Sequence, residues 1–84
     1  MDGYEGLRKE LDEKGFPMKY MYKFITSEDN IALLMPVFEN AEITTKRSSK
    51  GKYISFSAIE IAMSSDHIIN KYKSLSHIKG LISL

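Results

Sequence analysis

The chain has 84 residues, of which 43% are hydrophobic and 27% charged, and its formal net charge is +1. This length holds one domain with one hydrophobic core, and the near-neutral charge gives no global field that would favour nucleic acid or anionic lipid. The absence of cysteine excludes disulfides, thiolate metal sites and cysteine nucleophiles, and a small domain without such cross-links is expected in the cytoplasm.

Residues 1–15 are predicted to be an N-terminal extension that contains a short helix. Tyr4 to Lys14 is rich in good helix formers, and Leu7 and Leu11 give it a narrow apolar stripe, so we expect a peripheral helix. Its acidic and basic side chains differ from the apolar segment of a signal peptide. No apolar run in the chain approaches the roughly 20 residues that cross a bilayer, so no membrane span is expected.

Residues 16–84 are predicted to form the domain itself, and its first strand is Met18 to Ile25. The period of two in a strand places the tyrosines on one face and two lysines, Lys19 and Lys23, on the other. We therefore expect the tyrosine face to meet the helices.

A helix is expected after this strand. Thr26 or Ser27 can cap it, and Thr26 followed three residues later by Asp29 resembles a capping box. Apolar residues then recur at helical spacing. Pro36 would remove a helical hydrogen bond at a cost of about 3 kcal/mol, so the helix should kink or end near Met35.

Two strands joined by a tight turn are predicted next. Residues 41–48 contain β-branched side chains typical of a strand, and residues 53–63 form a longer one. The turn between them contains Gly51, which supplies a positive φ. In the longer strand the apolar alternation changes phase, which predicts a β-bulge near Ala58.

The last helix and the last strand follow. Ser64 or Ser65 can cap the helix, in which apolar residues from Ile68 to Ile78 recur at helical spacing. Gly80 interrupts the pattern, and the apolar tail from Leu81 to Leu84 is predicted as a final strand.

This order of elements predicts an α+β, ferredoxin-like βαββαβ fold. It is a two-layer sandwich in which a four-stranded antiparallel sheet has two helices on one face. The first and third strands are central, and the other two are at the edges. The second face of the sheet is open and is the natural place for a ligand or partner.

Three stretches of the chain resemble the YbeD-like family of small bacterial proteins: Phe16-Pro17-Met18-Lys19, Ser48-Ser49-Lys50-Gly51-Lys52-Tyr53 and Lys79-Gly80-Leu81-Ile82. The resemblance covers residues 16–84, and the hairpin is its most specific element. It implies an ACT-like domain, similar in fold to regulatory domains that bind amino acids, without an assigned biochemical role. The chain departs from the family pattern at Tyr22, where glycine is frequent, and at Pro36.

Catalytic and metal-binding residues are not expected. His67 and His77 lie ten residues apart on one predicted helix, roughly 280° apart around its axis, so they cannot share a metal and should lie on the helix surface. Without cysteine, and with no histidine placed to activate a serine, the chain has no nucleophile arrangement. We expect neither an enzyme nor a cofactor.

The basic hairpin is the candidate ligand or anion contact. Open sheets of this topology bind single-stranded RNA when the third strand begins with Lys or Arg followed by Gly, and aromatic residues lie one and three positions after the glycine. In this chain Lys50-Gly51 provides the beginning of the pattern, but those two positions hold Lys52 and Ile54. The same charges would also keep the hairpin soluble and discourage edge pairing. The candidate contacts are Lys19, Lys23, Lys46, Arg47, Lys50, Gly51, Lys52 and Tyr53.

The leading interpretation is a non-catalytic regulatory or small-ligand-sensing ACT-like module, with an effector such as an amino acid. One alternative is a single-stranded nucleic-acid-binding domain that uses the open face and the hairpin, although nucleic acid is the less expected partner. A second alternative is a protein-interaction subunit without a small ligand. The last strand carries no gatekeeper charge, so a homodimer through its edge is a further hypothesis, with contacts at Leu81, Ile82 and Leu84.

Overall fold

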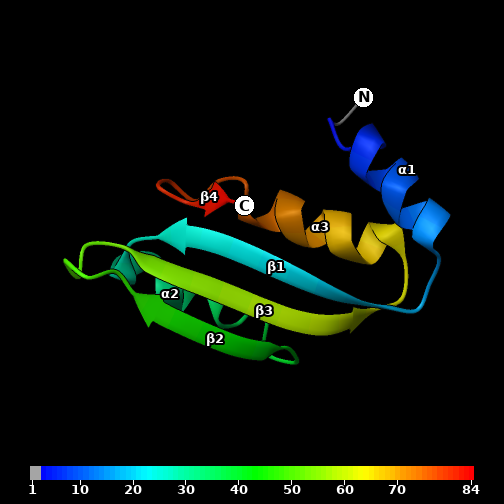
Figure 1. Ribbon diagram of the computed structural model, residues 1–84. Coiled ribbons are helices and arrows are strands. Elements are labelled where there is room, and N and C mark those ends of the chain that lie inside the picture. Colours follow the sequence, from blue (N-terminus) through cyan, green and yellow to red (C-terminus); the bar gives the residue numbers. More distant parts are fainter. Residues whose placement is uncertain (1–2) are drawn as a thin grey trace.

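The computed structural model describes residues 3–84, so residues 1–2 of the predicted extension lie outside the described part (Figure 1). Its four strands form one antiparallel sheet in the order β2-β3-β1-β4. This is the predicted ferredoxin-like topology, with β1 and β3 in the centre. The elements are α1 (Glu5–Lys14), β1 (Met18–Thr26), α2 (Glu28–Leu34), β2 (Glu42–Arg47), β3 (Ile54–Ala62), α3 (Ser65–Leu75) and β4 (Ile82–Ser83).

The hydrophobic core lies between one face of the sheet and the helices. The tyrosine face of β1 is the buried one, as predicted, and Tyr22 and Phe24 are almost fully enclosed. Phe38, from the turns that follow α2, lies in the middle of this layer. Its ring centroid is 4.9 Å from that of Tyr22 and 5.7 Å from that of Phe56. The core is therefore largely aromatic.

Most residues of helix α1 are exposed, which is consistent with the predicted peripheral helix, and the helix contributes one buried residue to this core. Leu11 is buried with the core residues. Arg8 reaches α3, where its Nη1 lies 2.7 Å from Oδ1 of Asp66. The helix ends at Lys14, and Gly15 follows it with a φ of 82°, a conformation that is favourable for glycine.

Strands β1 and β3 pair without interruption, from Met18 with Ala62 to Thr26 with Ile54. The β-bulge predicted near Ala58 is therefore wrong. The apolar alternation changes phase for another reason: isoleucines occupy the open face of β3 in its second half. Because the register is unbroken, Glu60 keeps its place on the helix-covered face.

Helix α2 ends at Leu34, two residues before Pro36, as predicted. The predicted capping box is wrong. Thr26 cannot cap the helix because it still belongs to β1. Ser27 occupies the N-cap position, and its side chain makes no capping hydrogen bond. The buried hydroxyl of Thr26 instead accepts a hydrogen bond of 2.8 Å from Nδ2 of Asn30.

Helix α3 begins at the predicted cap. Oγ of Ser64 accepts a hydrogen bond of 3.1 Å from the backbone N–H of His67. The helix ends at Leu75, and Ile78 packs on the core from the turn that follows. None of the helices in residues 3–84 is long and apolar enough to cross a membrane.

Strand β4 is shorter than predicted, since only Ile82 and Ser83 pair with β1. Leu81 packs against the core from the residue before the strand. The partners of β4 are Phe24 and Ile25, near the end of β1. Strand β4 therefore pairs with only a small part of this edge of β1 (Figure 1).

Candidate ligand-binding site

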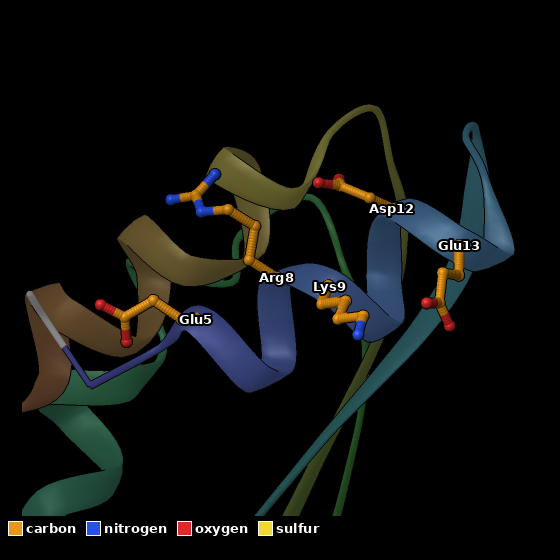
Figure 2. Close-up of a pocket in the computed structure, with 5 residues that line it drawn as sticks. All are labelled: Glu5, Arg8, Lys9, Asp12 and Glu13. Atoms are coloured by element: carbon orange, nitrogen blue, oxygen red, sulfur yellow. The ribbon is translucent and has the colours of Figure 1, made fainter.

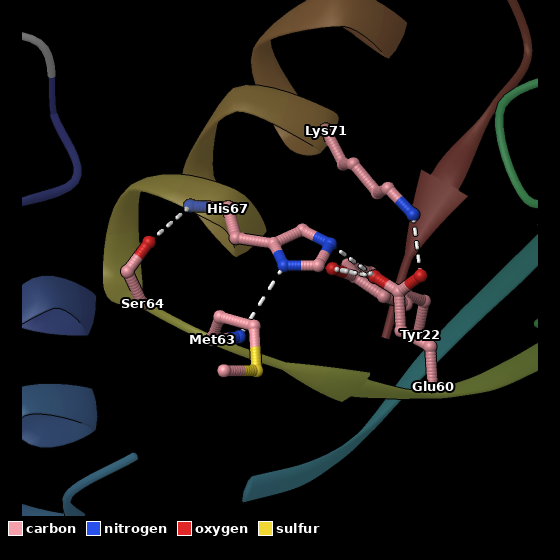
Figure 3. Close-up of polar contacts among 6 residues, drawn as sticks. All are labelled: Tyr22, Glu60, Met63, Ser64, His67 and Lys71. Carbon is pink, nitrogen blue, oxygen red and sulfur yellow. Dashed lines mark hydrogen bonds and ion pairs between the residues drawn. The ribbon is translucent and has the colours of Figure 1, made fainter. Parts of the chain in front are cut away.

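Glu60 places a carboxylate on the helix-covered face of β3, where its side chain is 6% exposed. A carboxylate at this depth needs hydrogen-bond donors to offset its lost hydration. Three side chains supply them (Figure 3). Oη of Tyr22 donates to Oε2 over 2.8 Å, Nζ of Lys71 donates to Oε1, and Nε2 of His67 lies 3.2 Å from Oε2. We call these four residues the Glu60 cluster.

The secondary structure brings this cluster together. His67 and Lys71 are four residues apart on α3, so they lie on one face of the helix, one turn apart. Tyr22 pairs with Ala58 across the β1–β3 ladder and is therefore diagonal to Glu60. The cluster thus joins both central strands to α3.

The ring of His67 is held at both nitrogens. Nδ1 accepts a hydrogen bond of 3.3 Å from the backbone N–H of Met63 (Figure 3). Nε2 faces Oε2 of Glu60. The two contacts together fix the orientation of the ring.

Lys71 is held at a defined position, and its ammonium group keeps N–H donors that Glu60 does not engage. Its side chain is 20% exposed, and Nζ lies 5.1 Å from the ring centroid of Phe38 and 5.8 Å from that of Tyr22. These contacts stabilise a cation. The ammonium group has three N–H donors and gives one to Glu60, so it can donate to a further anion.

The pKa values follow from these contacts. Burial by itself would raise the pKa of the Glu60 carboxyl, but hydrogen bonds from Lys71 and Tyr22, with the charge of Lys71, outweigh it and hold that pKa below its ordinary value. Burial and the hydrogen bond to Glu60 raise the pKa of the Tyr22 phenol. At neutral pH the carboxyl is ionised and the phenol keeps its proton.

This lowered pKa predicts acid-dependent stability. Above the ordinary pKa of 4.5 the stabilisation by Glu60 is complete, and it is lost as the pH falls through the lower pKa of the folded state. Urea unfolding should show that the free energy of unfolding falls below about pH 5, and falls less in Glu60→Gln. The same pH dependence in both proteins would show that Glu60 is not responsible.

A hollow of 550 Å³ opens beside the Glu60 cluster, a volume typical of small-molecule sites. Charged and polar groups of both signs line it, together with an apolar wall. It can accept a small molecule that carries both charges and a short apolar part. Its lining residues are Pro36, Val37, Glu39, Asn40, Glu60, Ile61, His67 and Lys71.

A second hollow, of 440 Å³, lies on the outer surface of α1. Figure 2 shows that its side chains point in different directions along the helix, with Glu5 and Glu13 far apart. Arg8 is already engaged by Asp66 of α3. Because one helix supplies the whole lining, this surface has no opposite wall that could enclose a ligand.

The predicted contact residues lie in two regions. Lys19 and Lys23 flank Met21 on the open face of β1. Lys46, Arg47 and Tyr53 border a hollow of 220 Å³ at the β2–β3 hairpin. None of the eight predicted residues lines the hollow beside Glu60. Their role as ligand contacts stays a prediction.

Two of the basic side chains of the hairpin, Arg47 and Lys52, already make contacts within the domain. Nη2 of Arg47 pairs with Glu28 over 2.9 Å, and Nη1 donates to the carbonyl of Gly51 over 3.0 Å. Nζ of Lys52 lies 5.5 Å from the ring centroid of Tyr53. Gly51 has the predicted positive φ, at 71°. Lys50 is exposed in the turn.

Sequence reasoning missed the Glu60 cluster and placed His67 on the helix surface, which is wrong. Its side chain is 31% exposed and faces the sheet. His77, by contrast, is exposed beyond the end of α3. The available signal was an acidic residue at an inward position of the third strand, opposite a helix with His67 and Lys71 four residues apart.

The open face of β1 and β3 carries lysine, methionine, isoleucine and serine. The aromatic side chains of β1 and β3 point to the helices instead: Tyr20, Tyr22, Phe24 and Phe56. Single-stranded RNA recognition on such a sheet uses exposed aromatic side chains that stack with bases. These strands do not present that surface.

Fold and site together define a small α+β domain of ferredoxin-like topology, with a polar hollow between α3 and the segment that joins α2 to β2. The chain belongs to a family described as a protein of unknown function (DUF493), whose model matches residues 12–83. The match spans all four strands and is consistent with the YbeD-like resemblance. Comparison with curated proteins and with solved structures gives no significant match. Within residues 3–84, no three His, Asp or Glu side chains are grouped so that they could hold a metal ion.

Proposed function

We propose that this chain is a non-catalytic, cytoplasmic bacterial regulatory domain of ACT-like type that binds a small zwitterion, such as an amino acid, beside the Glu60 cluster. The observation that carries this proposal is a buried carboxylate that holds a lysine at the wall of a hollow of suitable size. A lysine fixed in this way is a preorganised anion site, because binding does not have to order its side chain.

The lining indicates how such a ligand would be oriented. The ligand carboxylate accepts a hydrogen bond from the remaining donors of Lys71. The ammonium group faces the oxygens of Glu39 and Asn40 on the opposite wall, and the apolar part lies against Val37 and Ile61. The ligand thus meets α3, β3 and the turns after α2.

This arrangement supports a regulatory role. Residues 36–40 belong to the turns after α2, whereas Lys71 belongs to α3, so a ligand in the hollow would link two segments that are far apart in the sequence. A ligand that binds the folded state also stabilises it. Occupancy would therefore tighten the outer surface formed by these turns, which a partner protein can recognise.

A thermal-shift screen of amino acids tests this function. A ligand at 100 times its Kd should stabilise the domain by about 2.7 kcal/mol and raise the Tm by roughly 10 °C or more. Lys71→Gln should abolish the shift, and the matched change Lys46→Gln at the hairpin should leave it intact.

The opposite pattern, in which Lys46→Gln removes the shift and Lys71→Gln does not, would move the site to the hairpin. If no amino acid changes the Tm at any concentration up to the solubility limit, the ligand-sensing proposal is wrong. The protein-interaction alternative would then become the leading one.

A further inference from the structure

Strand β1 has an edge that β4 covers only in part. The last backbone contact on this side is a hydrogen bond of 2.9 Å from the N–H of Leu84 to the carbonyl of Lys23. Backbone groups of alternate residues in a strand point to the same edge. Those of Lys19 and Met21 therefore point out of the sheet beside Lys23. Among residues 3–84, neither residue has a backbone partner on that side.

A hollow of 360 Å³ lies next to this edge, in line with the end of β4. Its walls are mostly aromatic and aliphatic and come from three elements besides β1. On its floor, the hydroxyls of Tyr20 and Tyr72 are 2.9 Å apart. The lining residues are Tyr4, Leu7, Tyr20, Tyr72, Ser83 and Leu84.

We propose that this edge binds an extended segment of a partner polypeptide, which adds to the sheet antiparallel to β1 and in line with β4. An extended peptide can add as a strand to a sheet edge whose backbone groups are unpaired. In this mode of recognition the main-chain hydrogen bonds give affinity and alternate side chains give specificity. Here β4 already shows that β1 accepts a strand in this direction.

The two faces of β1 define the sequence of the segment. A side chain opposite Tyr20 points to the helix side and enters the apolar hollow. A side chain opposite Met21 points to the open face, where Lys19 and Lys23 flank it, and Met21 itself is 55% exposed. The partner segment therefore alternates apolar residues with acidic ones.

Fluorescence anisotropy with a labelled peptide of alternating valine and glutamate tests this proposal. The peptide should bind the wild type saturably. Met21→Pro removes the outward N–H but no β1–β3 hydrogen bond, so the fold tolerates it better than a proline at a neighbouring position. It should weaken binding about tenfold or more.

Thr45→Pro is the matched control, because Thr45 also directs its N–H out of the sheet, at the other edge. The N–H of Ser48, three residues later, donates a hydrogen bond to the carbonyl of Tyr53, the residue before β3. Because successive residues of a strand point to opposite edges, the N–H of Thr45 points away from β3. Thr45→Pro should leave the affinity unchanged. Circular dichroism of both variants establishes that they are folded.

A second arm uses the wild-type protein alone and does not depend on how the variants fold. N-methylation of the peptide amides that face β1 should remove binding, and a valine–lysine peptide should bind about tenfold or more weakly. The proposal is overturned if the wild type does not bind the peptide or if N-methylation has no effect. It is also overturned if the edge instead pairs with a second copy, seen as a dimer that Met21→Pro dissociates.

Discussion

Replacing Phe38 with alanine is expected to lower the free energy of unfolding by about 3–5 kcal/mol. The side chain is fully buried, and its ring centroid lies 4.9 Å from that of Tyr22, 6.1 Å from that of Phe24 and 5.7 Å from that of Phe56. Alanine would leave a cavity among these rings. Small domains have a total stability of about 5–15 kcal/mol, so the loss should be plain in urea unfolding followed by circular dichroism.

Leu33→Ala is the control for this change. Leu33 lies five residues earlier, in α2, and its side chain is 53% exposed, so its loss should cost about 0.5 kcal/mol or less. A similar cost for both substitutions would contradict the placement of Phe38 at the centre of the core. Because Phe38 lies among the turns that line the hollow, its loss should also weaken ligand binding.

Replacing Glu60 with alanine is expected to lower the free energy of unfolding by about 2–4 kcal/mol. The change leaves the Tyr22 hydroxyl without its acceptor and Lys71 without its ion pair. The partial exposure of Lys71 keeps the cost at the lower end of values for buried pairs. Urea unfolding at neutral pH gives this free energy, and the same variant should lose ligand-induced stabilisation because Lys71 is no longer held in place.

A double variant separates the structural role of the pair from its binding role. Glu60→Leu combined with Lys71→Met replaces the pair by apolar side chains of similar size, which often restores stability. It should be more stable than Glu60→Ala by about 1–2 kcal/mol and still fail to bind the ligand. If the double variant binds as well as the wild type, the charges beside the hollow have no part in recognition.

The fold could be predicted from the sequence because its signals lie within single elements. Alternation in β1 indicates its buried face, Ser64 marks the start of α3, and Pro36 explains the early end of α2. Each is a local constraint that does not depend on distant partners. The predicted bulge fails for the same reason, since alternation cannot distinguish a register break from isoleucines placed on the open face.

The Glu60 cluster could not be predicted in this way. Its members come from three elements, and their contact depends on the β1–β3 register and on where α3 crosses the sheet. His67 has ordinary surface character in the helix pattern and becomes a partner only once Glu60 is known to face inward. The charge of the hairpin residues makes them the obvious candidates in the sequence. In the structure Arg47 already forms an ion pair with Glu28 and a hydrogen bond with the Gly51 carbonyl.

The most direct measurement is a titration of the ¹⁵N-labelled protein with individual amino acids, followed by amide NMR shifts. If the ligand site lies beside Glu60, at least one amino acid gives saturable shifts that fit a single Kd and are largest at Val37, Asn40, Ile61, His67 and Lys71. Lys71→Gln should abolish them. Shifts centred on the hairpin at residues 46–53, or no saturable shift with any amino acid, would contradict a ligand site beside Glu60.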